Sequence, residues 1–279
     1  MRLTIGFSPC PNDTFIFDAL VNKKIDTGEL QFAPVLEDVQ TLNEWAIQDR
    51  LDITKISYGV LPLVQKNYIL LNAGGALGMG VGPLLISKYE VRNMEDINDM
   101  HIVIPGAHTT AHMLFSLAFP QAKHKHFTIF SAIENAVLNQ EADAGVIIHE
   151  NRFTYEKKGL LKVMDLGEYW EQQTGLPIPL GGIVSKRNFD NTLNNNINGL
   201  IRKSIEYAFE NYPVISQYVK QYSQEMDEGV MRQHIDLYVN DYSLDLRENG
   251  KKAVKEFLNV YKEINHQKMD DADIFLNNS

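Results

Sequence analysis

The chain has 279 residues, 44% of them hydrophobic and 22% charged, a composition typical of a globular protein with one large domain or two ordinary ones. Its formal net charge of −10 makes nucleic acid an unexpected partner, because nucleic-acid binding normally needs a basic face. Cys10 is the only cysteine, so the chain forms no internal disulfide. The sequence has no secretion signal and no apolar run near the roughly 20 residues of a membrane span, so we expect a cytoplasmic protein without a membrane partner.

Strands and helices alternate through the first half of the chain. Residues 2–8 are predicted to form a buried strand, which the two prolines after it interrupt. The polar residues Asn12, Asp13 and Thr14 are candidate N-caps. They precede a predicted helix over 15–23, and Asn12 and Asp13 either only cap this helix or also contact a ligand. Further strands are predicted at 30–37, 51–57, 68–72 and 101–105, and further helices at 41–50, 60–66 and 111–119.

Two segments 91 residues apart share one plan. Residues 42–57 and residues 133–148 are each predicted to form a helix, a polar turn with an aspartate, and a short strand. A repeated unit of this kind is the simplest explanation, and it predicts two α/β lobes of similar design. The alignment places Tyr58 opposite His149.

Two similar apolar strands, 82–88 and 182–186, bracket the second of these units. If one lobe is inserted into the other, these strands are the crossovers that join the lobes. We therefore predict a first lobe of residues 1–85 and 185–279, and an inserted second lobe of residues 89–181. The helices of the C-terminal third are expected to pack on the first lobe, and a ligand is expected in the cleft between the lobes.

His149 directly follows the predicted buried strand 144–148. The carboxyl ends of parallel strands are where α/β proteins usually bind ligands. A histidine at this place either takes part in chemistry or caps the end of the strand by hydrogen bonds. Arg152 and Tyr155 come soon after it, and they are more typical of a surface arginine and a packed tyrosine than of ligand contacts.

Several other polar residues are predicted to line the cleft. Ser57 ends one predicted strand, and Thr109 and Thr110 precede a predicted helix. Helix N-termini carry free N–H groups and a partial positive charge, so the cleft is expected to favour an anion such as a carboxylate. Lys55 would add a full positive charge.

The sequence predicts neither a metal ion nor an organic cofactor. His108 and His112 have the spacing of helical metal ligands but lack an obvious third ligand. Cys10 has no sequence partner that marks a nucleophile and is more typical of a small buried residue. The glycines of 74–82 precede a predicted strand rather than a helix, which is not the arrangement of a dinucleotide-binding loop.

Six motifs in co-linear order make residues 3–186 resemble the 1,4-dihydroxy-6-naphthoate synthase family. This family belongs to the futalosine route to menaquinone. The motifs are SPCPNDTF (8–15), TKIS (54–57), GGALG with GVGP (74–78 and 80–83), HTTA (108–111), GVIIHENRFTY (145–155) and TGLPIPLG (174–181).

The resemblance implies a periplasmic-binding-protein-like fold of type II, in which a hinge joins two α/β lobes. It also implies a lyase that splits cyclic dehypoxanthine futalosine into 1,4-dihydroxy-6-naphthoate and a sugar-derived fragment, without a metal or organic cofactor. His149 matches the proposed proton acceptor of the family. The positions that would line the substrate site are Lys55, Ile56, Ser57, Thr109 and Thr110.

Two other functions stay open, and the sequence predicts no oligomeric state. A solute-binding or ligand-sensing protein would share the fold without catalysis. Chorismate dehydratase of the same pathway is a related enzyme class, although the SPCPND and IIHE motifs argue against it. Formation of the naphthoate from the cyclic precursor would distinguish the three.

Overall fold

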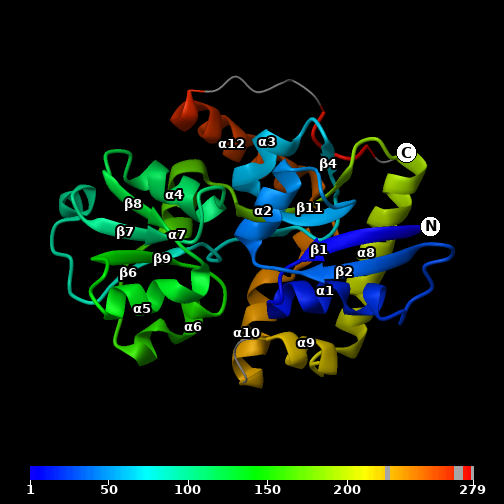
Figure 1. Ribbon diagram of the computed structural model, residues 1–279, viewed down its shortest axis with the longest axis horizontal. Coiled ribbons are helices and arrows are strands. Elements are labelled where there is room, and N and C mark those ends of the chain that lie inside the picture. The colour runs from blue at the N-terminus through cyan, green and yellow to red at the C-terminus, as the bar shows by residue number, and fades with distance from the viewer. Residues whose placement is uncertain (224–226, 267–272, 278–279) are drawn as a thin grey trace.

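The computed structural model describes residues 1–223, 227–266 and 273–277, and it consists of two α/β lobes side by side (Figure 1). The first sheet has the strand order β2-β1-β3-β11-β4, with β5 paired to β11, and the second has the order β10-β6-β9-β7-β8. The strands of the first sheet are β1 (Arg2–Phe7), β2 (Gln31–Leu36), β3 (Ile53–Ser57), β4 (Tyr68–Leu70), β5 (Ala76–Gly78) and β11 (Ile178–Lys186). Those of the second sheet are β6 (Leu84–Ser87), β7 (His101–Ile104), β8 (His124–Phe127), β9 (Ala144–Ile147) and β10 (Leu161–Asp165).

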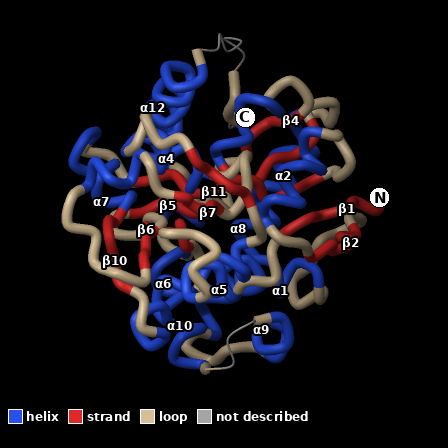
Figure 2. The backbone as a smooth tube through the Cα atoms, turned by 60° about the vertical axis from the view of Figure 1, so that its left-hand side comes forward, coloured by secondary structure: helices blue, strands red, loops and turns tan. Residues whose placement is uncertain are grey.

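Helices flank both sheets, with α12 on one side of the molecule and α9 and α10 on the opposite side (Figures 1 and 2). The helices are α1 (Pro11–Val21), α2 (Val39–Ile47), α3 (Leu61–Val64), α4 (Thr110–Ala118), α5 (Ile133–Leu138), α6 (Asn151–Thr154), α7 (Leu166–Thr174), α8 (Asn191–Asn211), α9 (Gln217–Tyr222), α10 (Glu228–Tyr238), α11 (Asp241–Leu244) and α12 (Arg247–Asn265). None of the helices in the described ranges combines the length and the apolar character needed to span a bilayer.

The two sheets repeat one strand arrangement. β3 lies parallel to β1 and antiparallel to β11, just as β9 lies parallel to β7 and antiparallel to β6. Ile53 of β3 pairs with Ser185, and Ala144, which follows Ile53 by 91 residues, pairs with Ser87. This pairing confirms the predicted repeat. It also brings the carboxyl ends of β3 and β9 to equivalent places in the two lobes.

β6 and β11 take part in different sheets. β6 pairs with β9 and β10, so residues 84 and 85 lie in the second sheet although they were assigned to the first lobe. β11 pairs with β3, β4 and β5, and it begins at Ile178, earlier than the predicted strand 182–186. The glycine-rich segment 74–82, for which no strand was predicted, contains β5. The lobe boundaries themselves stay a proposal.

The core of the first lobe is built around α1, which is buried on nearly all sides. Phe17 of α1 stacks on Phe7 of β1 with ring centroids 4.5 Å apart. α8, α9 and α10 all pack against α1, and Ile197 and Ile201 of α8 are fully buried there. α1 therefore fixes the position of α10, although more than 200 residues separate the two helices in sequence.

α12 packs against both lobes. It contacts β11 and the 3-10 turn η1 (Tyr58–Val60) of the first lobe, and also α4 of the second. Phe257 of α12 lies 5.8 Å from the ring of Trp170 and 6.5 Å from that of Tyr58, measured between ring centroids. α12 therefore packs on the first lobe, as predicted, and contacts the second lobe as well.

α1 begins earlier than the sequence suggested. Its first residue is Pro11, which suits the first helical position because proline lacks an N–H group and its φ is already helical. The N-cap is Cys10, whose side chain makes no capping hydrogen bond. The prediction that Asn12, Asp13 or Thr14 caps this helix is wrong. These residues form the first turn, which leaves the side chains of Asn12 and Asp13 for other partners.

Candidate functional site

A cavity lies between the lobes, where β1, β3 and β9 end. The space between its walls measures about 710 Å³, including its mouth. All predicted site residues line it, namely Lys55, Ile56, Ser57, Thr109, Thr110 and His149. The other polar lining residues are Ser8, Asn12, Asp13, His234 and Tyr238, and apolar lining comes from Val39, Leu42, Val81, Ile148 and Leu180 among others. Apolar walls with a few convergent polar groups are typical of a site for a small organic ligand.

His149 stands two residues beyond β9 and adopts the left-handed backbone conformation, with a φ of 58°. Residues other than glycine adopt this conformation uncommonly, and it can mark a functional site. The ring of Phe130 contacts the imidazole edge-on, with ring centroids 4.8 Å apart. Nε2 of His149 is buried and has no hydrogen-bond partner within the described ranges.

The imidazole of His149 is neutral at pH 7. Burial lowers its pKa to about 4; Asp13 and Asp38 oppose this shift, and Lys55 reinforces it. Burial has this effect because a charged imidazolium loses more hydration energy than a neutral ring. A neutral imidazole on a cavity wall can accept a proton from a bound ligand and so act as a general base.

Lys55 does not present a free positive charge to the cavity. Its Nζ lies 3.0 Å from Asp13 Oδ1 and also donates a hydrogen bond to the carbonyl oxygen of Gly74. The other carboxylate oxygen of Asp13 accepts hydrogen bonds from the backbone N–H and the hydroxyl of Ser8. The positive charge that Lys55 was expected to add is therefore compensated by Asp13.

Ser57 and the two threonines are held by specific hydrogen bonds. Asn43 donates to Ser57 Oγ at 3.1 Å and accepts from the Ser57 backbone N–H at 2.9 Å. Thr109 is the N-cap of α4, and its Oγ1 accepts from the backbone N–H of His112. Thr110 Oγ1 donates to the carbonyl oxygen of Leu180 at 2.7 Å, which ties α4 to β11. Thr109 Oγ1 also donates to the carbonyl oxygen of Gly106, so both threonine hydroxyl protons are engaged. The N–H groups of the first turn of α4 are the better donors for a ligand.

One residue missed by the sequence analysis, His234, completes the polar wall. His234 of α10 is fully buried, and its Nε2 lies 3.0 Å from Asn12 Oδ1. Its pKa is well below the ordinary value because of burial and the neighbouring His149. Glu150 is also buried, with Oε2 at 3.8 Å from His234 Nδ1. In sequence, His234 is typical of an ordinary core position on an amphipathic helix, and only the packing of α10 on α1 brings it to the cavity.

A family described as menaquinone biosynthesis matches residues 3–263 of this chain. The chain belongs to this family. It is 42% identical over 252 residues to 1,4-dihydroxy-6-naphthoate synthase of Thermus thermophilus, a match that covers 90% of this chain and 91% of that protein. It is 39% identical over 265 residues to the enzyme of the same name from Streptomyces coelicolor, covering 92% and 91%. The chain is therefore an enzyme of menaquinone biosynthesis, and its substrate is a small molecule.

Solved structures confirm the predicted fold class of this menaquinone-biosynthesis enzyme. An Archaeoglobus fulgidus protein superposes with a TM-score of 0.90 at 32% identity, covering 95% of this chain and 98% of that one. The periplasmic aliphatic sulphonate binding protein SsuA of Escherichia coli superposes with a TM-score of 0.69 at 10% identity, covering 100% and 92%. At that identity the second likeness concerns the fold alone, which is a periplasmic-binding-protein-like fold.

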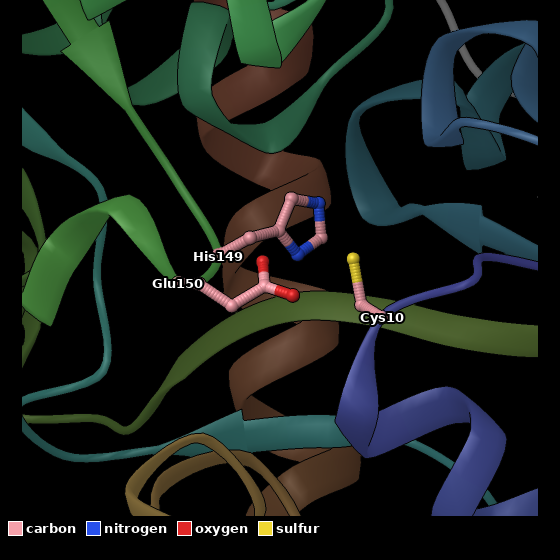
Figure 3. Close-up of side chains that lie close together, drawn as sticks. All are labelled: Cys10, His149 and Glu150. Atoms are coloured by element: carbon pink, nitrogen blue, oxygen red, sulfur yellow. The ribbon is translucent and has the colours of Figure 1, made fainter. Parts of the chain in front are cut away.

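Cys10, His149 and Glu150 point towards one another in the enzyme (Figure 3). A ligand atom from each lies within 4.8 Å of the other two, so the three could together contact a metal ion. A cysteine ligand must be a thiolate. Burial, with Glu150 adding to it, raises the pKa of the Cys10 thiol well above its ordinary value. The thiol form is favoured, which fits the prediction of a small buried residue better than that of a ligand.

The remaining candidates lie outside the cavity wall. Ring nitrogen Nδ1 of His112, in the first turn of α4, lies 2.8 Å from the carbonyl oxygen of Ala107 in the preceding loop. Arg152 donates to the carbonyl oxygens of Gly80 and Gly82 and forms an ion pair with Asp165. The hydroxyl of Tyr155 donates to Glu156, and its ring is buried in the second lobe. These contacts favour a structural role for Arg152 and Tyr155. Arg152 is not a free surface residue, because it binds the backbone just before β6.

Proposed function

We propose that this chain is a lyase that converts cyclic dehypoxanthine futalosine to 1,4-dihydroxy-6-naphthoate, with His149 as the general base. The observation that carries the proposal is the state of this histidine. Its imidazole is neutral, lines the interlobe cavity, and has a buried Nε2 without a hydrogen-bond partner in the described part of the chain. The names of the two relatives support the choice of product.

The chemistry demands little more than a positioned base and a polar wall. Release of an aromatic naphthoate requires the removal of a proton at carbon and the breaking of a bond to the sugar-derived fragment. Aromatisation favours this step, so the protein contributes mainly by orienting the substrate, accepting the proton and excluding water. A metal ion or organic cofactor is not part of the proposal.

Backbone N–H groups at the start of α4 and the side chain of Ser57 would hold the substrate carboxylate or a developing oxyanion. Both are at the cavity, and a helix N-terminus favours negative charge. Because Asp13 compensates Lys55, this lysine would orient Asp13 and donate to the substrate only secondarily. The apolar part of the lining, including Leu42 and Leu180, would contact the aromatic ring system.

The direct test is incubation of the purified protein with the cyclic precursor, with the naphthoate followed by mass spectrometry. The proposal predicts that the precursor disappears as naphthoate forms in equal amount. A ligand sensor would bind the precursor and return it unchanged, whereas a chorismate dehydratase would consume chorismate and leave the precursor intact. Either result would contradict the proposal.

A cytoplasmic location and the absence of a nucleic-acid partner stay predictions.

A further inference from the structure

The cavity contains a second buried histidine whose ring faces the first. The imidazole of His234 lies nearly parallel to that of His149, with an interplanar angle of 17° and ring centroids 6.0 Å apart. His234 comes from α10, which packs on the first lobe through α1, whereas His149 follows β9 of the second lobe. Phe130 contacts His149 from within the second lobe. The proposed base therefore has a ring contact with each lobe.

A chain of hydrogen bonds fixes the orientation of His234. The side-chain amide of Asn12 donates to Asp13 Oδ1 at 2.9 Å, so the amide oxygen is the atom that faces His234. This oxygen can only accept, and it lies 3.0 Å from Nε2 of His234, so Nε2 must carry the hydrogen. Asp13 is itself held by its ion pair with Lys55. The ring of His234 is thus anchored to β3 of the first lobe through three consecutive side chains.

The opposite edge of the same ring reaches the second lobe. Since the buried ring is neutral and Nε2 carries the hydrogen, Nδ1 of His234 is the unprotonated nitrogen. It lies 3.8 Å from Glu150 Oε2, and Glu150 is the residue next to His149. His234 therefore donates a hydrogen bond to Asn12 of the first lobe, and its ring faces that of His149 in the second lobe. At 3.8 Å Glu150 makes no hydrogen bond to Nδ1, so the ring contact with His149 is the one that separation of the lobes would break.

We infer that His234 is a positioning residue that holds the imidazole of His149 in its working orientation when the lobes meet. The inference rests on the proposed role of His149 as the base. Nε2 of His149 has no hydrogen-bond partner among the described residues, and the ring contacts with Phe130 and His234 orient the imidazole. Lobe closure would then also align the base, because it is the first lobe that brings the ring of His234 against His149.

Three variants of His234 separate its two contacts. His234→Gln keeps a donor for Asn12 but lacks the ring, His234→Phe keeps a ring but lacks the donor, and His234→Ala removes both. We expect kcat to fall on the order of 10- to 100-fold in His234→Ala, because small misplacement of a catalytic group has effects of this size. His234→Gln and His234→Phe should each lose less than His234→Ala. KM should change less than about threefold in all three, because the substrate is held mainly by other groups.

Met231 provides the matched control for loss of packing. It lies on the same helix, is 1% exposed, and belongs to the apolar core of the first lobe rather than to the cavity lining. Met231→Ala should lower the melting temperature at least as much as His234→Ala while leaving kcat near the wild-type value. If folded His234 variants keep wild-type kcat, or if Met231→Ala loses kcat to the same extent, His234 has only a structural role and the inference is wrong.

A second measurement does not depend on turnover. In protein labelled with ¹⁵N-histidine, the His149 resonances can be assigned by their absence in His149→Ala. They should shift in His234→Gln and His234→Ala, and stay in place in Met231→Ala. Failure of the wild-type protein to convert the precursor would overturn the proposed function, whereas unmoved His149 resonances would overturn the positioning role.

Discussion

Lys55 Nζ lies 3.0 Å from Asp13 Oδ1, in an ion pair whose side chains are only 7% and 3% exposed. The pair joins β3 to the first turn of α1 at the cavity wall. A buried ion pair of this kind is costly to break, because removal of one partner leaves the other charge buried without compensation. It also leaves the cavity less positive than the sequence suggests.

The first prediction concerns this pair. Lys55→Met should lower the free energy of unfolding by about 3–5 kcal/mol, the usual cost of removing one member of a buried pair. The double variant Lys55→Met with Asp13→Asn should recover part of the loss, because no uncompensated charge is left. Urea unfolding of the two single variants and the double variant measures this coupling. Strictly additive losses would contradict a direct interaction.

The second prediction concerns the pH dependence of activity. Because the pKa of His149 is lowered to about 4, the base is already unprotonated at mildly acidic pH. A profile of kcat/KM against pH should therefore stay flat from pH 8 down to about 5.5 and fall only at lower pH. An acidic limb with its midpoint near 6.5, the ordinary pKa of histidine, would contradict the lowered value.

The third prediction concerns the pH dependence of stability. The pKa of His149 is lower in the folded state than in the unfolded chain, so between about pH 6.5 and 4 the unfolded chain binds a proton that the folded protein does not. The free energy of unfolding should fall as the pH drops through this window, by up to roughly 3 kcal/mol from this residue. His149→Gln should remove this part of the loss. Equal slopes in the two proteins, measured by urea unfolding at several pH values, would exclude the contribution.

The fourth prediction concerns Gly59, which follows Tyr58 in the 3-10 turn η1. A Cβ atom at this position would lie 2.8 Å from the backbone carbonyl carbon and oxygen of Thr109 in the other lobe. Gly59→Ala should push the start of α4 away from the cavity and raise KM about tenfold or more, because the anion-binding N–H groups move with it. Gly199→Ala is the control, since a Cβ there meets no atom within 4 Å. An unchanged KM in Gly59→Ala would show that the lobes tolerate the shift.

The sequence predicted the site residues that stand at the ends of the two repeated strands. Ser57 and His149 stand at the ends of β3 and β9, and the repeat with its offset of 91 residues is confirmed by the strand pairing. A short apolar strand followed by polar residues is a local pattern, so it can be recognised without knowledge of the fold. The polar cluster Asn12–Thr14 was also recognised, although it forms the first turn of α1 and does not cap it.

The residues that depend on distant packing could not be predicted in this way. His234 reaches the cavity only because α10 packs on α1, and Glu150 becomes relevant only through its distance from His234. The neutralisation of Lys55 likewise depends on where the first turn of α1 begins, which Pro11 sets. α12 contacts both lobes for a similar reason, since the positions of Trp170 and Tyr58 are set by two different sheets.

The central claim is that His149 removes the proton in the conversion of the cyclic precursor, and a single comparison tests it most directly. Single-turnover formation of the naphthoate should be measured for the wild type, for His149→Ala and for His126→Ala, whose histidine is exposed on β8. We expect His149→Ala to lose about 100-fold or more in the rate while still binding the naphthoate, and His126→Ala to match the wild type. Wild-type rates in a folded His149→Ala variant would contradict the account.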